Sequence, residues 1–297
     1  MQSKVLAALL AASFGWGFAG VGTRFLFGEG ATTFTVVVGR IFVATLVVLL
    51  IGHREIARIK VSAWRDGAII GVLRIGIAPA LFISSLQYVS AGIEGIFITL
   101  IPATTAALAA LFIRERLDRN QILGLLIGLL GTLLIVVSGE SGISEGGDIR
   151  TGAVLALIGV VAGASSGVLA RKYAPRHQTT ELAIPMFVAG ATVAFATGLA
   201  LRDIDIASVS GIAWPVLVAL GAGSTFLPFF ATLFASRHTS AARVALTGYL
   251  APVIGVIAGV VLLGEVLTIP IVIGAALALS GIAVAGARRR PVPAVSG

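Results

Sequence analysis

The stretch TLIPATTAALAALFIRERL, residues 99–117, places a proline within an apolar run and ends in a charged cluster. The stretch YLAPVIGVIAGVVLLGEVL, residues 249–267, repeats this arrangement 150 residues later without a gap. At the same offset the following residues match: Ala12 and Ala162, Gly17 and Gly167, Ser90 and Ser240, Ala91 and Ala241, Leu100 and Leu250, Pro102 and Pro252, Glu115 and Glu265, Leu117 and Leu267, Gly124 and Gly274, Gly131 and Gly281. Apolar matches arise by chance, but aligned proline, glutamate and glycines do not, so the chain contains an internal repeat.

The composition is that of a membrane protein. Of 297 residues, 58% are hydrophobic and 11% are charged, whereas a soluble domain carries about 25% charged residues. The apolar residues form runs of about 20, the length of a helix that crosses a bilayer. Cysteine is absent, which excludes disulfides and thiolate metal sites. The net charge of +8 comes from short loops, which favours membrane orientation over a nucleic-acid partner.

Ten apolar segments predict an all-α integral membrane protein with ten transmembrane helices. They span residues 4–23, 32–52, 67–88, 91–113, 120–138, 151–170, 182–201, 211–235, 240–263 and 267–287. The start of the chain could also be a signal peptide, but its apolar run is long and has a counterpart later in the sequence, so we treat it as a helix. The polar stretch at residues 138–150 divides two units, residues 1–140 and 150–290, of five helices each.

Because five is an odd number, the second unit must be inverted relative to the first. With a cytoplasmic amino terminus, the inner loops and tails hold 15 of the 21 basic residues and the outer loops hold three, Arg24, Arg150 and Arg202. We therefore expect both termini to be cytoplasmic, Glu115 at the inner surface and Glu265 at the outer surface. Two inverted repeats are typical of secondary transporters that expose a midplane site alternately to each face.

The chain resembles the drug/metabolite transporter superfamily, in particular its ten-helix members with two EamA-type units. The resemblance rests on WGFAGVGTRF (Trp16 to Phe25), on Arg40 within GRIFVATLVV, and on residues 88–136 with their counterpart at 238–284. It implies a carrier of small organic metabolites, often an exporter in a bacterial inner membrane, and amino-acid exporters form a large branch. It also implies a cavity surrounded by helices 1, 3, 4, 6, 8 and 9, with helices 5 and 10 as scaffold and helices 2 and 7 as mobile flanks.

Four prolines lie on helices that the resemblance places around the cavity: Pro79, Pro102, Pro228 and Pro252. Each removes a backbone donor and disturbs the preceding turn. Freed carbonyls at membrane depth are tolerated against protein or water. We expect hinges or cavity walls at these positions, with simple packing kinks as the alternative.

Four charged residues lie in or at the ends of apolar helices. Arg40 and Arg74 lie about eight residues from a helix end, roughly 12 Å deep, where an unpaired charge is costly. Arg40 is predicted to be structural, whereas Arg74 is a candidate for binding a substrate carboxylate. Glu94 and Arg243 begin helices 4 and 9 at opposite faces and could be gating residues, or interfacial charges that reach water.

A mixed aromatic and hydroxyl lining suits a small amphipathic substrate. The predicted substrate-binding residues, with Arg74, are Trp16, Phe82, Tyr88, Phe97, Thr99, Ser165, Ser166, Phe226, Thr247 and Tyr249. Each could instead serve packing alone, and Ser165–Ser166 could form a close helix contact. The glycine-rich run GLLIGLLG (Gly124 to Gly131) is assigned to helix packing, with a dimer contact as an alternative.

The sequence thus predicts a transporter, not an enzyme, without cofactor or metal, that exports amino acids or related metabolites by alternating access. It would act in the lipid bilayer as a monomer or homodimer. The three histidines are far apart in sequence, and no metal-ligand spacing, phosphate loop or nucleophile motif occurs. One rival is a lipophilic drug or cation exporter, although helix 1 lacks the acid that the small four-helix exporters carry. The other is a non-transporting scaffold or lipid-handling protein.

Overall fold

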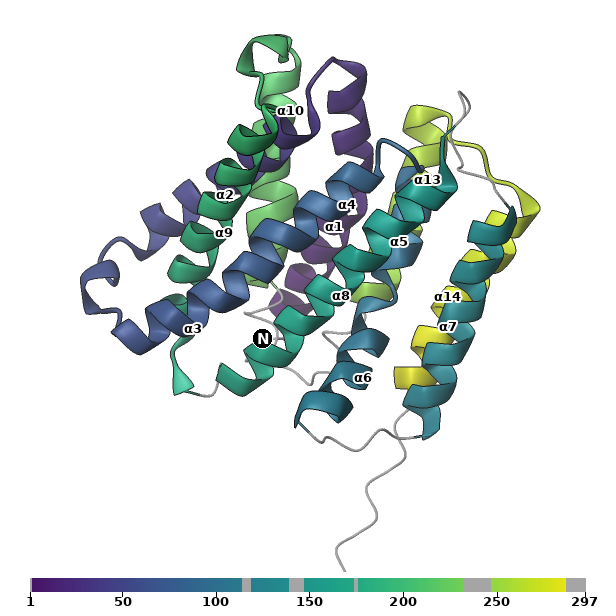
Figure 1. Cartoon of the computed structure of the whole chain (residues 1–297), viewed down its shortest axis with the longest axis horizontal. Coiled ribbons are helices and arrows are strands. Elements are labelled where there is room, and N and C mark those ends of the chain that lie inside the picture. Colours follow the sequence, from purple (N-terminus) through teal and green to yellow (C-terminus); the bar gives the residue numbers. More distant parts are fainter. Residues whose placement is uncertain (1, 114–118, 139–146, 174–175, 232–246, 287–297) are drawn as a thin grey trace, which may run out of the picture.

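The structure, a computed structural model, describes residues 2–113, 119–138, 147–173, 176–231 and 247–286. Its described part is helical without strands. The elements are α1 (Gln2–Gly28), α2 (Thr33–Gly52), η1 (Ile56–Arg58), α3 (Val61–Gly71), η2 (Val72–Ile77), α4 (Ala78–Ser85), α5 (Ala91–Ile98), α6 (Ile101–Ile113), α7 (Arg119–Ser138), α8 (Ile149–Tyr173), α9 (Thr179–Leu201), η4 (Ile206–Ser208), α10 (Ala213–Ala219), η5 (Leu220–Phe226), α13 (Thr247–Leu263) and α14 (Ile269–Gly286). They form one elongated bundle (Figure 1).

Six helical segments in the described part are long and apolar enough to cross a membrane. They span residues 6–28, 33–52, 61–85, 149–170, 180–201 and 213–231, and shorter apolar helices run through residues 122–131, 253–263 and 269–281. Large apolar side chains cover the outside of the bundle, among them Leu50, Val61, Phe112 and Val261. Such a surface suits hydrocarbon rather than water, so the structure confirms the expected all-helical membrane architecture.

Two helix starts differ from the sequence-based bounds, and one of them is capped by side chains. The third helix begins at Val61 rather than at residue 67, and the preceding linker contains the short 3-10 turn η1. The seventh helix begins at Thr179 rather than at residue 182. There the side chains of Gln178 and Glu181 form a reciprocal capping box, which satisfies free backbone donors of the first turn. Hydropathy gives no signal for such capping, so it placed the helix start too late.

Three helical segments are interrupted, and two of the interruptions correspond. Residues 61–85 run as α3, the π-helical segment η2 and α4, with Pro79 two residues after η2. Residues 213–231 run as α10, the π-helical segment η5 and further helix, with Pro228 two residues after η5. The segment at 91–113 is split at Thr99–Leu100 into α5 and α6, just before Pro102. Proline frees an upstream carbonyl, and a widened or broken turn accommodates it.

The helix contacts occur in corresponding pairs. Helix α1 packs on α13 and η5, and at the 150-residue offset α8 packs on α6, η2 and α4. Likewise α2 packs on η5, and α9 packs on η2 and α3. Two contacts in the described part join corresponding helices to each other: α2 with α9, and α7 with α14. In Figure 1 the pair α7 and α14 lies together at the right-hand edge of the bundle.

Glycines bring α7 and α14 into close contact. A Cβ placed on Gly131 would lie 2.5 Å from the carbonyl oxygen of Gly274, and one on Gly281 would lie 2.5 Å from that of Gly124. The run Gly124–Gly131 therefore packs against α14 of the same chain, as small residues commonly do between membrane helices. This confirms the assignment to helix packing and gives the run a partner within the chain.

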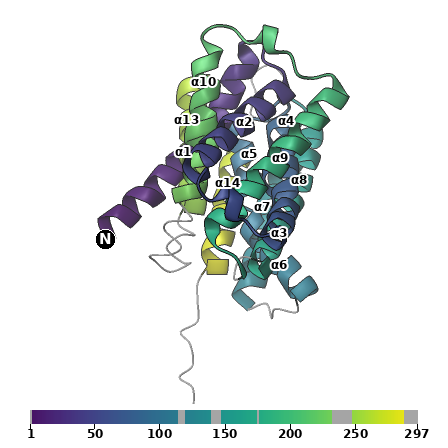
Figure 2. The same ribbon diagram turned by 90° about the vertical axis from the view of Figure 1, so that its left-hand side faces the viewer.

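The connections lie at two ends of the bundle. At one end lie the connections at residues 28–33, 85–91, 201–213 and 263–269, and we call this end the Glu265 face. Side chains tie these connections together: Ser210 Oγ donates to Glu29 Oε2 at 2.9 Å, and Asp203 Oδ2 accepts from the Phe34 N–H at 2.9 Å. The opposite end holds α3's first residues, the end of α6 and the amino-terminal residues of α1 (Figures 1 and 2).

Candidate functional site

A buried arginine links three helices in the middle of the bundle. Arg40 of α2 is 8% exposed. Its guanidinium donates to the Thr23 hydroxyl of α1 at 2.9 Å and to the Thr225 hydroxyl of η5 at 3.4 Å. Hydroxyl groups alone do not neutralise a buried cation, and Glu94 of α5 is the acid that interacts electrostatically with Arg40.

Glu94 lies in the first turn of α5 and is 7% exposed. It experiences both Arg40, which attracts it, and Glu265, which repels it. Its position near the helix amino terminus also favours a negative charge. The side chain is therefore held within the bundle, away from the water that an interfacial charge would reach.

Arg74 differs from Arg40 in having no matching partner among the residues that the structure describes. It lies within η2, is half-buried, and makes no hydrogen bond or ion pair with another described residue. A guanidinium at membrane depth is costly when it is neither paired nor solvated. A negatively charged ligand could therefore pair with the Arg74 guanidinium.

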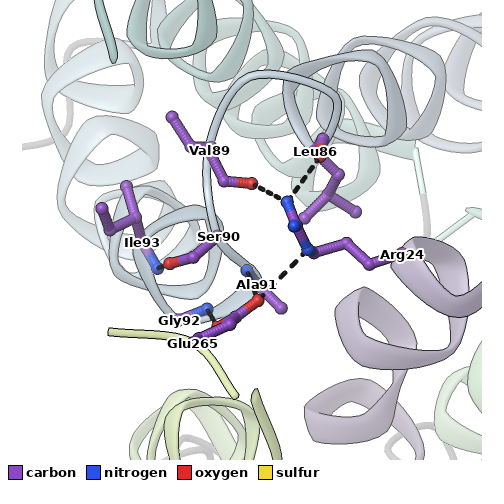
Figure 3. A network of polar contacts seen from close by, with 8 residues as sticks. All are labelled: Arg24, Leu86, Val89, Ser90, Ala91, Gly92, Ile93 and Glu265. Carbon is purple, nitrogen blue, oxygen red and sulfur yellow. Dashed lines mark hydrogen bonds and ion pairs between the residues drawn. The ribbon is translucent and has the colours of Figure 1, made fainter. Parts of the chain in front are cut away.

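At the Glu265 face, one carboxylate joins three parts of the fold (Figure 3). Glu265, which follows α13, is 8% exposed and accepts from the backbone N–H groups of Ala91 at 2.8 Å and Gly92 at 3.3 Å. Those groups are free donors at the start of α5. Arg24 Nε of α1 lies 3.3 Å from Glu265 Oε1, an ion pair without an aligned hydrogen bond.

The same arginine also fixes the connection before α5. Arg24 Nη1 donates to the carbonyl oxygens of Leu86 at 3.1 Å and Val89 at 3.0 Å. Figure 3 shows the guanidinium between these carbonyls and Glu265. The sequence indicated that Glu265 matches Glu115 and that Arg24 lies near the outer surface, but only the fold shows that the two residues meet.

The predicted lining residues do not surround one common cavity in the described part. Phe82 and Phe97 belong to an apolar core formed by α4, α5, α8 and α14. The hydroxyls of Thr99 and Ser166 donate to carbonyls of their own helices, those of Ile96 and Gly163. The remaining described positions are partly exposed: Trp16, Arg74, Tyr88, Ser165 and Phe226.

Thr99 is the predicted residue that lines a cavity of about 140 Å³. The other lining residues are apolar and come from α5, α13 and α14: Ile96, Val253, Val256, Ile257, Ala275, Ala278 and Leu279. Of the predicted hinge prolines, Pro79 and Pro228 are described with their π-helical neighbours. The side chains of Pro102, Thr247, Tyr249 and Pro252, and all of Arg243, lie outside the described residues.

A polar contact that the sequence did not predict lies at the opposite end. Asp66 of α3 is buried, and its Oδ2 lies 2.9 Å from His177 Nε2, just before α9. Arg65 donates to the other carboxylate oxygen, Oδ1, at 3.0–3.1 Å. Residues 111 positions apart form this contact, so sequence spacing gave no signal for it.

Comparison with known proteins agrees with this architecture. The model of the EamA-like transporter family matches residues 3–137 and again residues 150–287. An uncharacterized transporter of Archaeoglobus fulgidus is 27% identical over 197 residues, which are 66% of this chain and 67% of that protein. The uncharacterized transporter YyaM of Bacillus subtilis is 24% identical over 229 residues, 75% of each chain.

A solved structure shares the fold over 96% of this chain and 98% of its own, with a TM-score of 0.64 at 19% identity. That likeness concerns the fold alone. The family match supports a statement about function as well, because it covers nearly all of the chain in two consecutive units. Both named relatives are also described as transporters. The protein is a multi-pass membrane transporter and belongs to the EamA-like transporter family.

Proposed function

We propose that this transporter exports small carboxylate-bearing metabolites, with amino acids as the first candidates, by alternating access. It would do so with ten crossing helices arranged as two inverted units, residues 1–140 and 150–290. Both termini would be cytoplasmic in a bacterial inner membrane, so the Glu265 face would face outward. Transport would be secondary-active or facilitative, in a monomer or a homodimer.

The observation that carries this proposal is the pair of matching interruptions. The π-helical segments η2 and η5, each followed by a proline two residues later, occupy corresponding places in the two halves. Discontinuous helices at equivalent positions of two repeats commonly border the transport site. The corresponding helix contacts support the same arrangement, because two equivalent halves can exchange their conformations across a central site.

Arg74 supports a carboxylate substrate. It is part of η2 and has no ionic partner among the described residues. A substrate carboxylate would satisfy its guanidinium with charge-assisted hydrogen bonds. The matched position in the second half is Ser224, which carries no charge, so the site would hold a single cation.

The electrostatics disfavour the rival cation exporter. Such a transporter needs a membrane carboxylate that can pair with the cationic drug. Among the buried acids in the described part of the chain, Glu94 is the best candidate for that carboxylate. Arg40 already interacts with Glu94, and a permanently charged arginine opposes a second cation there. The hinge roles of Pro79, Pro102, Pro228 and Pro252 and gating by Glu94 and Arg243 remain predictions within this proposal.

The test is efflux from proteoliposomes preloaded with labelled amino acids, with and without a pH gradient. We expect flux in the wild type, a loss of about tenfold or more in Arg74→Ala, and partial retention in Arg74→Lys. Arg150→Ala, which removes an exposed cation from the start of α8, is the matched control. An effect of the gradient would identify proton coupling.

Two results would contradict the proposal. Equal flux in the wild type and Arg74→Ala would remove Arg74 from the site. Absence of flux for every amino acid in a correctly folded preparation would reject this substrate class. Uptake of cationic dyes by the same vesicles would then support the drug exporter, and no flux of any solute would support a non-transporting role.

A further inference from the structure

The Glu265 face is sealed by more than one layer of contacts. Beneath the Glu265 carboxylate, a small apolar cluster brings together Val21 of α1, Leu86, Ala91 of α5 and Ala258 of α13, all at most 5% exposed. Backbones approach closely here: a Cβ on Gly20 would lie 2.9 Å from the Ala91 Cβ. The polar network thus covers an apolar plug between the helices that the family resemblance places around the cavity.

A glycine turn directs Glu265 into this position. Gly264 ends α13 in the left-handed region, with φ of +64°, which favours glycine. The chain then folds back, so that the Glu265 N–H bonds the Gly259 carbonyl at 3.2 Å. The absence of a side chain at Gly259 leaves room for the carboxylate, because a Cβ there would lie 2.2 Å from Glu265 Oε2.

The seal is confined to one half of the broken fourth segment. Helix α5 packs on α13, α1, α8 and α14, whereas α6, beyond the interruption at Thr99–Leu100, packs on α8, α7 and α14. Within the described residues, α6 and α13 share no comparably extensive contact. Both halves of this segment pack on α8 and α14, but the extensive contact with α13 belongs to the half nearer the Glu265 face.

The sequence differs at the positions that correspond to this seal. At the 150-residue offset Glu265 corresponds to Glu115, but Arg24 corresponds to Ala174 and Gly264 corresponds to Arg114. The corresponding positions thus lack both the cation that pairs with the glutamate and the glycine that turns it inward. The two ends of an otherwise repeated fold differ in the residues that decide how tightly each one closes.

We propose that Arg24 and Glu265 form a gate that holds the Glu265 face closed in the resting transporter, and that this gate exists at one face only. The inference rests on the proposed alternating access and deepens it, because it assigns the resting conformation. The ion pair and the helix-start hydrogen bonds stabilise the closed state, and opening must break all of them together. With the Glu265 face outward, the resting protein would be closed to the outside and would load substrate from the cytoplasm.

The absence of cysteine from the chain makes a direct test simple. Ala258→Cys places one thiol in the plug, and Ile206→Cys places one on the exposed surface of the same face. Both are treated with a membrane-impermeant maleimide in spheroplasts and in inverted vesicles. The preparation in which Ile206→Cys reacts identifies the side on which the Glu265 face lies, and the gate is assayed there.

We expect Ala258→Cys to react slowly in the wild-type background and about tenfold faster with Arg24→Ala or Glu265→Gln. A tenfold change corresponds to about 1.4 kcal/mol in the opening equilibrium. Arg24→Lys should give an intermediate rate, because it keeps the charge but not the two directed contacts to the carbonyls. Arg150→Ala, an exposed cation of the same face, should leave the rate unchanged.

A third thiol separates opening of the gate from unfolding. Ala156→Cys lies fully buried in α8, within the core away from the plug, and should stay unreactive in every background. Unchanged labelling of Ala258→Cys in both gate variants, with this control protected, would overturn the gate. Faster labelling at both Ala258→Cys and Ala156→Cys would also overturn it, because the residues would then serve stability alone. Labelling requires no substrate, so the result is independent of whether amino acids are transported.

Discussion

His177 Nε2 lies 2.9 Å from Asp66 Oδ2 and thereby joins the start of α9 to α3 at the end of the bundle opposite the Glu265 face. Both side chains are nearly inaccessible, with 6% and 2% of their surfaces exposed. Their backbones also approach closely nearby, because a Cβ on Gly67 would lie 2.9 Å from the Leu182 carbonyl oxygen. The polar contact therefore fixes the register of two closely packed helices.

Asp66→Ala should destabilise the protein by about 1–3 kcal/mol, the cost of leaving a buried polar partner unsatisfied. His177 would lose its acceptor, whereas Arg65 is exposed and would turn to water. Thermal unfolding in detergent, followed by tryptophan fluorescence, measures the change. Glu55→Ala, an exposed acid in the neighbouring linker, is the control. Equal unfolding temperatures for Asp66→Ala and the control would contradict the structural role.

Arg40 and Glu94 should behave as a coupled pair. Arg40→Ala removes the cation that attracts the buried Glu94 and the donor that the Thr23 and Thr225 hydroxyls accept from, which should cost about 1–3 kcal/mol. Glu94→Gln in the same chain should recover a part of that loss, since an amide carries no charge to compensate. Unfolding of the two single variants and the double variant gives the coupling energy. Strictly additive effects would show that the two residues stabilise the fold independently.

Close packing of α7 on α14 should not tolerate a side chain at Gly131. Gly131→Val would force the helices apart, because its Cβ alone would overlap the Gly274 carbonyl oxygen. We expect a destabilisation of about 1–3 kcal/mol, the usual range for overpacking. Gly28→Ala is a matched control, since a Cβ there meets no atom within 4 Å. Unfolding of Gly131→Val at the wild-type temperature would contradict the close packing of α7 on α14.

The prolines after the π-helical segments should affect transport more than stability. Pro79→Ala and Pro228→Ala each restore a backbone donor, which favours regular α-helix in η2 or η5 and stiffens the segment. We expect flux to fall several-fold while thermal stability is kept or increased. Pro215→Ala, in the exposed first turn of α10, should change neither quantity. Unaltered flux in both hinge variants would leave the prolines with a packing role.

The sequence by itself determined the class, the family and the repeat. Runs of about 20 apolar residues must form helices in lipid, since no water is present to satisfy open backbone groups. The matching proline, glutamate and glycines at an offset of 150 correspond to the two units that the family model matches. The sequence also predicted the packing role of Gly124–Gly131, because close approach of membrane helices requires small residues.

Tertiary structure alone decided which charged groups meet. Arg40 reaches Thr23 and Thr225 from other helices, and Arg24 reaches a glutamate 241 residues away in the chain. Hydropathy reports how deep a charge lies but not which neighbour faces it, because side-chain direction depends on helix rotation and on the packing of distant segments. The same limit explains why Phe82 and Phe97, chosen as lining residues from their helices, lie in an apolar core. Periodicity fixes the helices, whereas the contacts between helices fix the site.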